Sequence, residues 1–173
     1  NSNTVFAYSN DGYGRALETN QSTVKDNMVH AAYHTRGFWG SNTVVENNSF
    51  TGNYSGQSPF HDQGVVDWNN TEWGIGSGPN IVARNNSFTD FGYGFRMENG
   101  TDCISEYNDF TIHSSTGFEV DGGINTIIRF NNIVMDGGNS YGMHFASSNV
   151  TNIYRNTIVS KGTDNSGTGI RVE

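Results

Sequence analysis

Charged side chains recur at fixed distances after glycine in the second half of the chain. The residues found two or four positions after such glycines include Arg96, Glu98, Glu119, Asp121 and His144. Paired carboxylates can exchange protons with a bound molecule or hold a cation, and arginine or histidine can neutralise an anion or accept a proton. We therefore predict that these five residues form a catalytic group.

Aromatic residues accompany this group at nearby positions of the same repeat. The side chains that we predict to bind a substrate are Trp39, Trp68, Tyr93, Tyr141 and Arg171. Aromatic faces stack on pyranose rings, and carboxylates form hydrogen bonds to hydroxyl groups. A groove of this composition is therefore suited to a polysaccharide.

A lyase is the first of three mechanisms that these residues could serve. It would need a cation that neutralises a uronate carboxylate and a base, such as Arg96 or His34, that takes a proton from carbon. Carboxylate oxygens are the ligands that Ca²⁺ prefers in proteins. The candidates to hold a Ca²⁺ ion for that neutralisation are Glu98, Glu119 and Asp121.

A hydrolase is the second mechanism, and it would place two carboxylates across the scissile bond. Glu98 with Glu119, or Glu119 with Asp121, are the candidate pairs. The third alternative is a metal site made of His34, His61 and Asp62. The sequence does not choose among the three, so the metal, where one is used, stays open.

A purely structural role is compatible with the same residues. Arg96, Glu119 and His144 share one repeat position, and a ladder of charges there would only keep the surface soluble. Trp39 and Trp68 would then pack beneath loops instead of binding a ligand.

Two interleaved repeats must position all of these side chains. The motif glycine, apolar, any residue, apolar begins at Gly14, Gly37, Gly64, Gly94, Gly117, Gly142 and Gly169. An asparagine followed two positions later by an apolar residue recurs at Asn27, Asn48, Asn86, Asn108, Asn131 and Asn156. Two strand signals in every roughly 20–30 residues are typical of a solenoid.

The alternation of strands assigns a direction to each position of these repeats. Residues one and three positions after glycine should point inward, and those two and four positions after it should point outward. The repeated asparagine should mark a bend, where it tolerates a left-handed backbone and bonds the next asparagine along the coil. Before each asparagine we predict an outward ladder of alternating charge, formed by Lys25, Glu46, Arg84, Glu106, Arg129 and Tyr154.

Two insertions interrupt the asparagine repeat between Asn48 and Asn86. They lie around residues 51–59 and 70–79 and contain both prolines of the chain. Long loops on a rigid solenoid commonly flank its working surface.

Composition restricts the partners of this chain. Its 173 residues carry a net charge of −8, so no basic stripe is available to bind nucleic acid. No apolar run reaches the length of a membrane span, and we predict no insertion into a membrane. The single cysteine, Cys103, should be buried on a strand as a small apolar residue.

Seven Asn-x-Ser/Thr triplets are potential glycosylation sites. They begin at Asn20, Asn47, Asn53, Asn69, Asn85, Asn99 and Asn149. Such triplets also arise by chance in a chain rich in these residues, but seven are consistent with a glycoprotein outside the cell or on its surface.

The repeats resemble those of the right-handed parallel β-helix superfamily. Val45-Glu-Asn-Asn-Ser-Phe50 and Ile128-Arg-Phe-Asn-Asn-Ile133 carry the likeness, together with strands such as Gly94-Phe-Arg-Met97. Pectate-lyase-like enzymes share this coil, and a weaker likeness is to disaggregatase-type surface proteins of methanogens. The resemblance implies one all-β domain over residues 1–173, a single-stranded right-handed parallel β-helix with about seven rungs. It implies no catalytic residue, because the repeat specifies fold and not activity.

Two functions remain as hypotheses. The first is an extracellular carbohydrate-active protein that binds a polysaccharide and cleaves it as a lyase or a glycoside hydrolase. The second is a structural surface or filament glycoprotein that assembles through the open ends of its coil, because the last strand signal ends at Glu173 without a polar cap.

Overall fold

The computed structural model describes residues 2–8, 14–32, 35–52, 63–68, 79–98, 101–135, 141–146, 152–161 and 167–173. Within these ranges only the backbone is described for residues 8, 14, 32, 35, 36, 39, 63–68, 92–94, 96–98, 113–115 and 121. The insertions around 51–59 and 70–79 therefore lie mostly outside the described residues. All structural statements below concern the described part of the chain.

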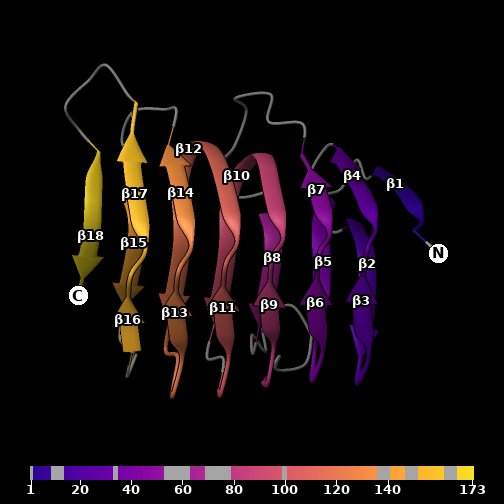
Figure 1. The fold of residues 1–173 in the computed structure, drawn as a ribbon, viewed down its shortest axis with the longest axis horizontal. Helices are drawn as coiled ribbons and strands as arrows, with labels where there is room; N and C mark the ends of the chain where they lie inside the picture. The colour runs from indigo at the N-terminus through magenta and orange to yellow at the C-terminus, as the bar shows by residue number, and fades with distance from the viewer. Residues whose placement is uncertain are drawn as a thin grey trace.

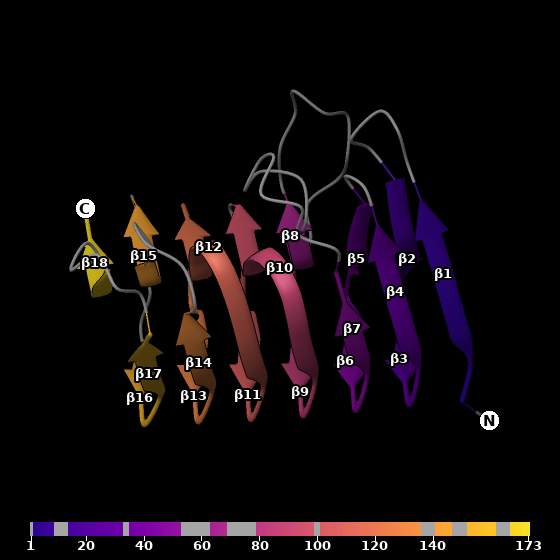
Figure 2. The same ribbon diagram turned by 90° about the horizontal axis from the view of Figure 1, so that it is seen from above.

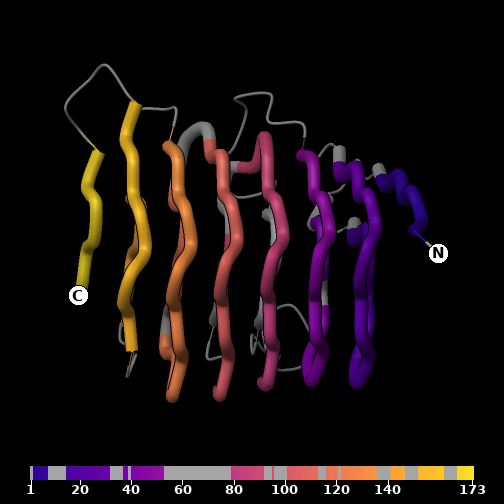
Figure 3. Tube along the Cα trace, viewed as in Figure 1, coloured from indigo at the N-terminus to yellow at the C-terminus, as the bar shows by residue number. Residues whose placement is uncertain are grey.

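The described chain winds into a parallel β-solenoid, as the two repeats predict (Figure 1). Successive coils lie side by side along the long axis, and the two termini lie at its opposite ends (Figure 3). One face of the coil is built from β1 (Thr4–Tyr8), β4 (Met28–Ala32), β7 (Ser49–Thr51), β10 (Ser87–Glu98), β12 (Asp109–Asp121), β14 (Asn132–Met135) and β17 (Thr157–Ser160).

A second face of the same sheet shares the two longest strands. It consists of β2 (Gly14–Asn20), β5 (Thr35–Ser41), β8 (Gln63–Trp68), the second halves of β10 and β12, β15 (Tyr141–Ala146) and β18 (Thr168–Val172). Strand β10 bends between the two faces, where its pairing with β12 shifts on either side of Phe91.

A separate sheet of short strands closes each coil (Figure 2). Its members are β3 (Thr23–Lys25), β6 (Val44–Glu46), β9 (Val82–Arg84), β11 (Ile104–Glu106), β13 (Ile127–Arg129) and β16 (Asn152–Tyr154). Among the described residues no strand of this sheet follows β17 and β18. Complete coils are therefore fewer than the seven that the repeats predict.

The interior is a set of apolar columns that run along the coil. Phe88 stacks between Phe50 and Phe110, with ring centroids 5.0 and 4.8 Å apart. Phe95 stacks on Phe118 at 4.5 Å in a second column. All five rings are buried, so the narrow interior is filled by aromatic side chains that each cover the next coil. Cys103 is buried, as predicted, but it lies directly before β11 (Ile104–Glu106) and not on a strand.

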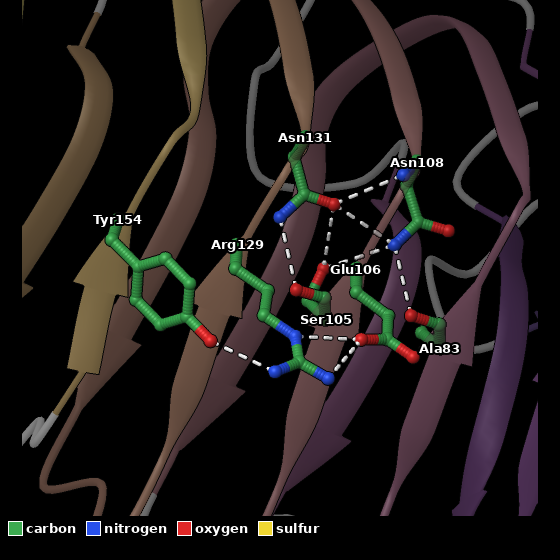
Figure 4. A network of polar contacts seen from close by, with 7 residues as sticks. All are labelled: Ala83, Ser105, Glu106, Asn108, Arg129, Asn131 and Tyr154. Atoms are coloured by element: carbon green, nitrogen blue, oxygen red, sulfur yellow. Dashed lines mark hydrogen bonds and ion pairs between the residues drawn. The ribbon is translucent and has the colours of Figure 1, made fainter.

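The repeated asparagines form an internal ladder at the bend before the first face. Asn108 is typical: its Oδ1 accepts hydrogen bonds from the backbone and side-chain N–H groups of Asn86 at 2.9 and 3.0 Å. Its own side chain donates to Asn131 of the next coil and to the carbonyl of Ala83 in the coil before (Figure 4). Each amide thus joins three coils. The ladder also includes Asn3, which the sequence repeat missed.

The sequence predicts a left-handed backbone at the repeated asparagine, and this is wrong. The left-handed residue is the one directly before it. The positive φ values, 55–57°, occur at Asp26, Asn47, Asn85, Tyr107, Phe130 and Arg155. The ladder asparagine keeps an ordinary backbone because its own N–H must point along the coil to the next amide. At Tyr107 and Phe130 this conformation costs about 1–2 kcal/mol each, since only glycine, asparagine and aspartate adopt it readily.

The sequence repeat assigns one glycine, Gly14, to the wrong position of its strand. Gly14 pairs with Thr35, and Leu17 pairs with Phe38, so Gly14 is not equivalent to Gly37. Ala16 consequently packs against the core, although its predicted position was outward. The other glycines follow the predicted register, in which Phe38 pairs with Val65 and Phe95 with Phe118. Glycine alone is a weak marker, because the pairing of β2 with β5, and not the residue type, decides which positions are equivalent.

Removal of a buried ladder amide should lower the free energy of unfolding more than removal of an exposed one. We expect Asn108→Ala to lower the free energy of unfolding by about 3 kcal/mol, because two donors of Asn86 lose their acceptor and the Ala83 carbonyl loses its donor. Asn3→Ala is the matched control: its amide is exposed, so the loss should stay below about 1 kcal/mol. Urea unfolding measures both, and equal losses would contradict the ladder's role.

Two glycines of the second face differ in the room around them. A Cβ added at Gly142 would lie 2.4 Å from Cγ2 of Ile158 and 2.6 Å from the Gly169 carbonyl, whereas one at Gly169 meets nothing within 4 Å. Gly142→Ala should therefore destabilise the chain by roughly 1–3 kcal/mol through overpacking. Gly169→Ala should change stability by less than about 0.5 kcal/mol in the same thermal or urea measurement. The reverse order would show that the register of β15 and β18 is wrong.

Candidate functional site

Strand register brings the predicted catalytic residues into two rows on the second face. Arg96, Glu119, His144 and Arg171 are partners across β10, β12, β15 and β18. Two positions further along the strands, Glu98, Asp121 and Ala146 are partners. Neighbouring strands lie about 4.8 Å apart, so side chains of one row fall within contact distance of each other.

The described part of this surface contains a histidine between two carboxylates. His144 Nδ1 lies 4.0 Å from Oε1 of Glu119, and His144 Nε2 lies 3.4 Å from Oε2 of Glu173. Glu119 and His144 are largely covered, with side chains 16% and 19% exposed, whereas Glu173 is 45% exposed. A carboxylate therefore faces each nitrogen atom of the imidazole, and only the one of Glu173 lies within hydrogen-bond distance.

Tyr141 and Arg171 lie beside this histidine. Arg171 donates a hydrogen bond to the hydroxyl of Tyr141 and forms an ion pair with Glu173. The ring of Tyr141 stacks on that of His144, with centroids 5.3 Å apart, and the Arg171 guanidinium lies 5.2 Å from the Tyr141 centroid. We call Glu119, Tyr141, His144, Arg171 and Glu173 the histidine cluster.

The sequence predicted four of the five members of the histidine cluster. Glu173 was not among the candidate residues, although it occupies the same repeat position as Glu98 and Asp121. This shared repeat position is the sequence signal that could have identified Glu173. The cluster offers a proton acceptor, two carboxylates and a cation, which are the groups used in acid–base cleavage.

The other predicted residues are placed only by their backbone. Trp39 and Arg96 both pair with Val66, on opposite sides of β8. Trp68 pairs with Glu98. Tyr93 and Tyr141 both pair with Thr116. Their register is compatible with one continuous surface, but the side chains of Trp39, Trp68, Tyr93, Arg96, Glu98 and Asp121 lie outside the described part.

Metal binding stays a prediction. Among the described residues no group of three or more His, Cys, Asp or Glu side chains is placed to hold a metal ion. The Ca²⁺ candidates Glu98 and Asp121 are described by backbone alone, and His34, His61 and Asp62 lie outside the described residues.

The predicted outward ladder of alternating charge is present on the sheet of short strands. Arg84 pairs with Glu46 at 3.0 Å, and Arg129 pairs with Glu106 at 2.6 Å. Arg129 also donates to the hydroxyl of Tyr154 at 2.8 Å (Figure 4). The hydrogen bonds to Tyr154 and to Glu106 raise the pKa of Arg129 above its ordinary value, so it stays charged. This ladder is structural, as its repeat position implied.

An exposed aromatic edge follows this ladder, and the sequence analysis did not predict it. The ring of Tyr107 stacks on that of Phe130 with centroids 4.8 Å apart, and Phe130 meets Tyr154 edge-on at 5.8 Å. Arg155 lies 5.7 Å from the Phe130 centroid. The signal was the residue directly before each ladder asparagine, which changes from Asp or Asn to Tyr, Phe and Arg along the chain.

Three of the seven potential glycosylation sites are described, and all three are exposed. They are Asn20, Asn47 and Asn85. Asn53, Asn69, Asn99 and Asn149 lie outside the described residues. Exposure allows glycosylation at the first three, and their occupancy stays a prediction.

Comparison with known proteins assigns no family. No protein-family model, curated protein or solved structure matches this chain. In the described residues there is no helix with the length and apolar character needed to cross a membrane.

Proposed function

We propose that this chain is an extracellular or cell-surface protein that binds a polysaccharide along its second face and cleaves it there. The observation that supports this proposal is the histidine cluster, in which His144 lies between Glu119 and Glu173 beside Tyr141 and Arg171. These groups converge on an outward face of parallel strands, where each coil can contact the next sugar unit of a polymer.

Binding along the coil axis follows from the direction of the rows. A polymer that crosses β10, β12, β15 and β18 would meet a new strand about every 4.8 Å, a step comparable to one pyranose ring. Tyr141 offers an aromatic ring, and Arg171 offers a cation for an acidic sugar. The predicted contributions of Trp39, Trp68 and Tyr93 would extend this contact toward the first coils.

Cleavage by β-elimination would use the histidine cluster directly. His144 would accept the proton from the carbon next to a uronate carboxylate, and Arg171 would neutralise that carboxylate. The bond to the leaving oxygen then breaks, and that oxygen takes a proton from Tyr141 or from water. A Ca²⁺ ion held by Glu98, Glu119 and Asp121 would be the alternative source of positive charge.

Hydrolysis is the alternative within the same site. Glu119, which is more deeply covered than Glu173, would serve as the acid, and Glu173 would serve as the second carboxylate. His144 would then position the two carboxylates instead of taking a proton from the substrate. The two reactions leave different chain ends, and this difference separates them.

A depolymerisation screen tests the proposal. Acidic and neutral polysaccharides are incubated with the chain, with and without Ca²⁺, and both new reducing ends and new unsaturated ends are measured. We expect cleavage that His144→Ala lowers by roughly 10²–10⁴-fold, the usual contribution of a general base. Unsaturated ends indicate elimination, and reducing ends alone indicate hydrolysis.

A matched control lies on the other sheet. Arg84→Gln removes from the structural ladder a charge about as exposed as that of Arg171, so turnover should stay within about twofold of the starting chain. Urea unfolding of each variant separates loss of activity from loss of fold. No cleavage over a broad panel, or full activity of both His144→Ala and Arg171→Ala, would refute catalysis at this cluster.

A structural role is the second candidate, and a separate observation favours it. Apolar side chains are exposed at both ends of the described coil: Ile170 and Val172 on β18 are 52% and 75% exposed, and Phe6 on β1 is 76% exposed. The asparagine ladder also has a direction, with amide acceptors toward Asn3 and donors toward Asn156. Coils of two copies could therefore stack end to end.

Sedimentation and electron microscopy test this second candidate. If copies stack, the chain should form fibres about one coil wide, and Ile170→Asp should disperse them because a charge then meets the apolar end of another coil. A monodisperse monomer over a wide range of concentration would exclude assembly through these ends.

A further inference from the structure

A depression on the bend before the first face lies apart from the histidine cluster. It measures about 380 Å³ and is shallow, with most of it open to solvent. Residues 47–49 and 85–87 of two adjacent coils line it, together with Tyr107 and Asp109 of a third. Its size falls in the range of small-ligand sites.

The amide groups at the floor of the depression already form hydrogen bonds within the chain, whereas the polar groups at its rim are exposed to solvent. Asn48 and Asn86 use their amide groups in the internal ladder, so they offer little to a ligand. Ser49, Ser87 and Asn85 are exposed around them. The rim therefore presents hydroxyl and amide groups that can both donate and accept hydrogen bonds.

Tyr107 forms one wall of the depression. One face of its ring is covered by Phe130, with centroids 4.8 Å apart and planes 2° from parallel, yet the residue remains 52% exposed. The equivalent position in the coil before holds Asn85, a much shorter side chain. The second face of the Tyr107 ring is therefore turned toward the space above Asn85.

The placement of a tyrosine here is unfavourable for the backbone. Its φ of 56° lies in the left-handed region, where Asn47 and Asn85 serve at the same position of the two preceding coils. Strained positions of this kind often carry functional side chains. The ring thus occupies a site where asparagine would suit the chain itself better.

The polar groups select a ligand that is neutral and rich in hydroxyl groups. Among the described residues the lining contains no lysine or arginine, and its only charged residue is Asp109, one oxygen of which accepts from Asn132 at 3.3 Å. An anionic sugar would find no cation here. A peptide would require an unpaired strand edge or an apolar groove, and the lining offers neither.

We propose that this depression binds one neutral hexopyranose unit of a saccharide chain, with the C–H face of the sugar ring stacked on Tyr107. Hydroxyl groups of the sugar would bond Ser49, Ser87, Asn85 and Asp109. The inference rests on the proposed function only in taking a carbohydrate as the ligand. It requires no catalysis and places the contact on a different edge of the coil.

Glycosylation competes for the same space. Asn47 and Asn85 are both potential glycosylation sites, and a glycan attached to either would enter the depression. Production of the 173-residue chain in a bacterial host without N-glycosylation leaves both side chains bare. Binding measured on that material is then binding of a free saccharide.

The experiment is titration calorimetry with a panel of neutral gluco-, manno- and galacto-oligosaccharides. We expect at least one to bind and Tyr107→Asn to weaken it about tenfold or more, the effect of losing one ring-stacking contact. Tyr107→Phe is the matched variant, since it keeps the ring and should bind within about threefold of the starting chain. Tyr107→Asn should still unfold cooperatively in urea, because asparagine is the residue that the neighbouring coils use at this position.

Failure of this inference is distinguishable from failure of the proposed function. Equal affinity of Tyr107→Asn and the starting chain, or no binding of any panel member, would overturn the depression as a sugar site, even where His144→Ala abolishes cleavage. Tyr107-dependent binding without any cleavage would support the depression and refute catalysis. A Tyr107→Asn chain that unfolds early but binds normally would assign the ring a purely structural role and also overturn the inference.

Discussion

The chain of amide hydrogen bonds from Asn3 to Asn156, which is buried between Asn48 and Asn131, is the interaction on which this structure depends. Each internal amide accepts from the coil before and donates to the coil after, and the ladder residues from Asn48 to Asn131 are 1–2% exposed. A buried amide without partners would cost several kcal/mol, so each coil must meet the next in one register only. The apolar columns fill the space that this register leaves.

The same register decides what the outer faces can display. Asn48 and Asn86 are 38 residues apart, against 22 between Asn86 and Asn108, yet both pairs bond in the same way. Extra residues are therefore accommodated outside the ladder and do not displace the strands. Because the ladder fixes neighbouring coils, side chains such as Glu119 and His144 meet across strands although 25 residues separate them in sequence.

The sequence repeats predicted the fold because each repeated residue has a physical role in the coil. Asparagine recurs where an amide must bridge coils, and the aromatic or branched residue two positions later fills the core, so both were predictable. The register of Gly14 was predicted wrongly because a glycine by itself does not specify which position of the next coil it pairs with. The repeat register was enough to predict the rows that hold Glu119, His144 and Arg171. The contact between His144 and Glu173 was not predictable from it, since side-chain rotamers depend on neighbours that a repeat does not specify.

The aromatic edge shows that coils with one backbone conformation can carry different side chains at the same exposed position. The position before the ladder asparagine must be left-handed in every coil, whatever its side chain. Asn47 and Asn85 satisfy it at little cost, whereas Tyr107 and Phe130 occupy it against their preference and remain on the surface. The stacking of the two rings offsets only part of that cost. The difference between coils that share one backbone therefore points to the side chains themselves, because the fold alone is served better by asparagine.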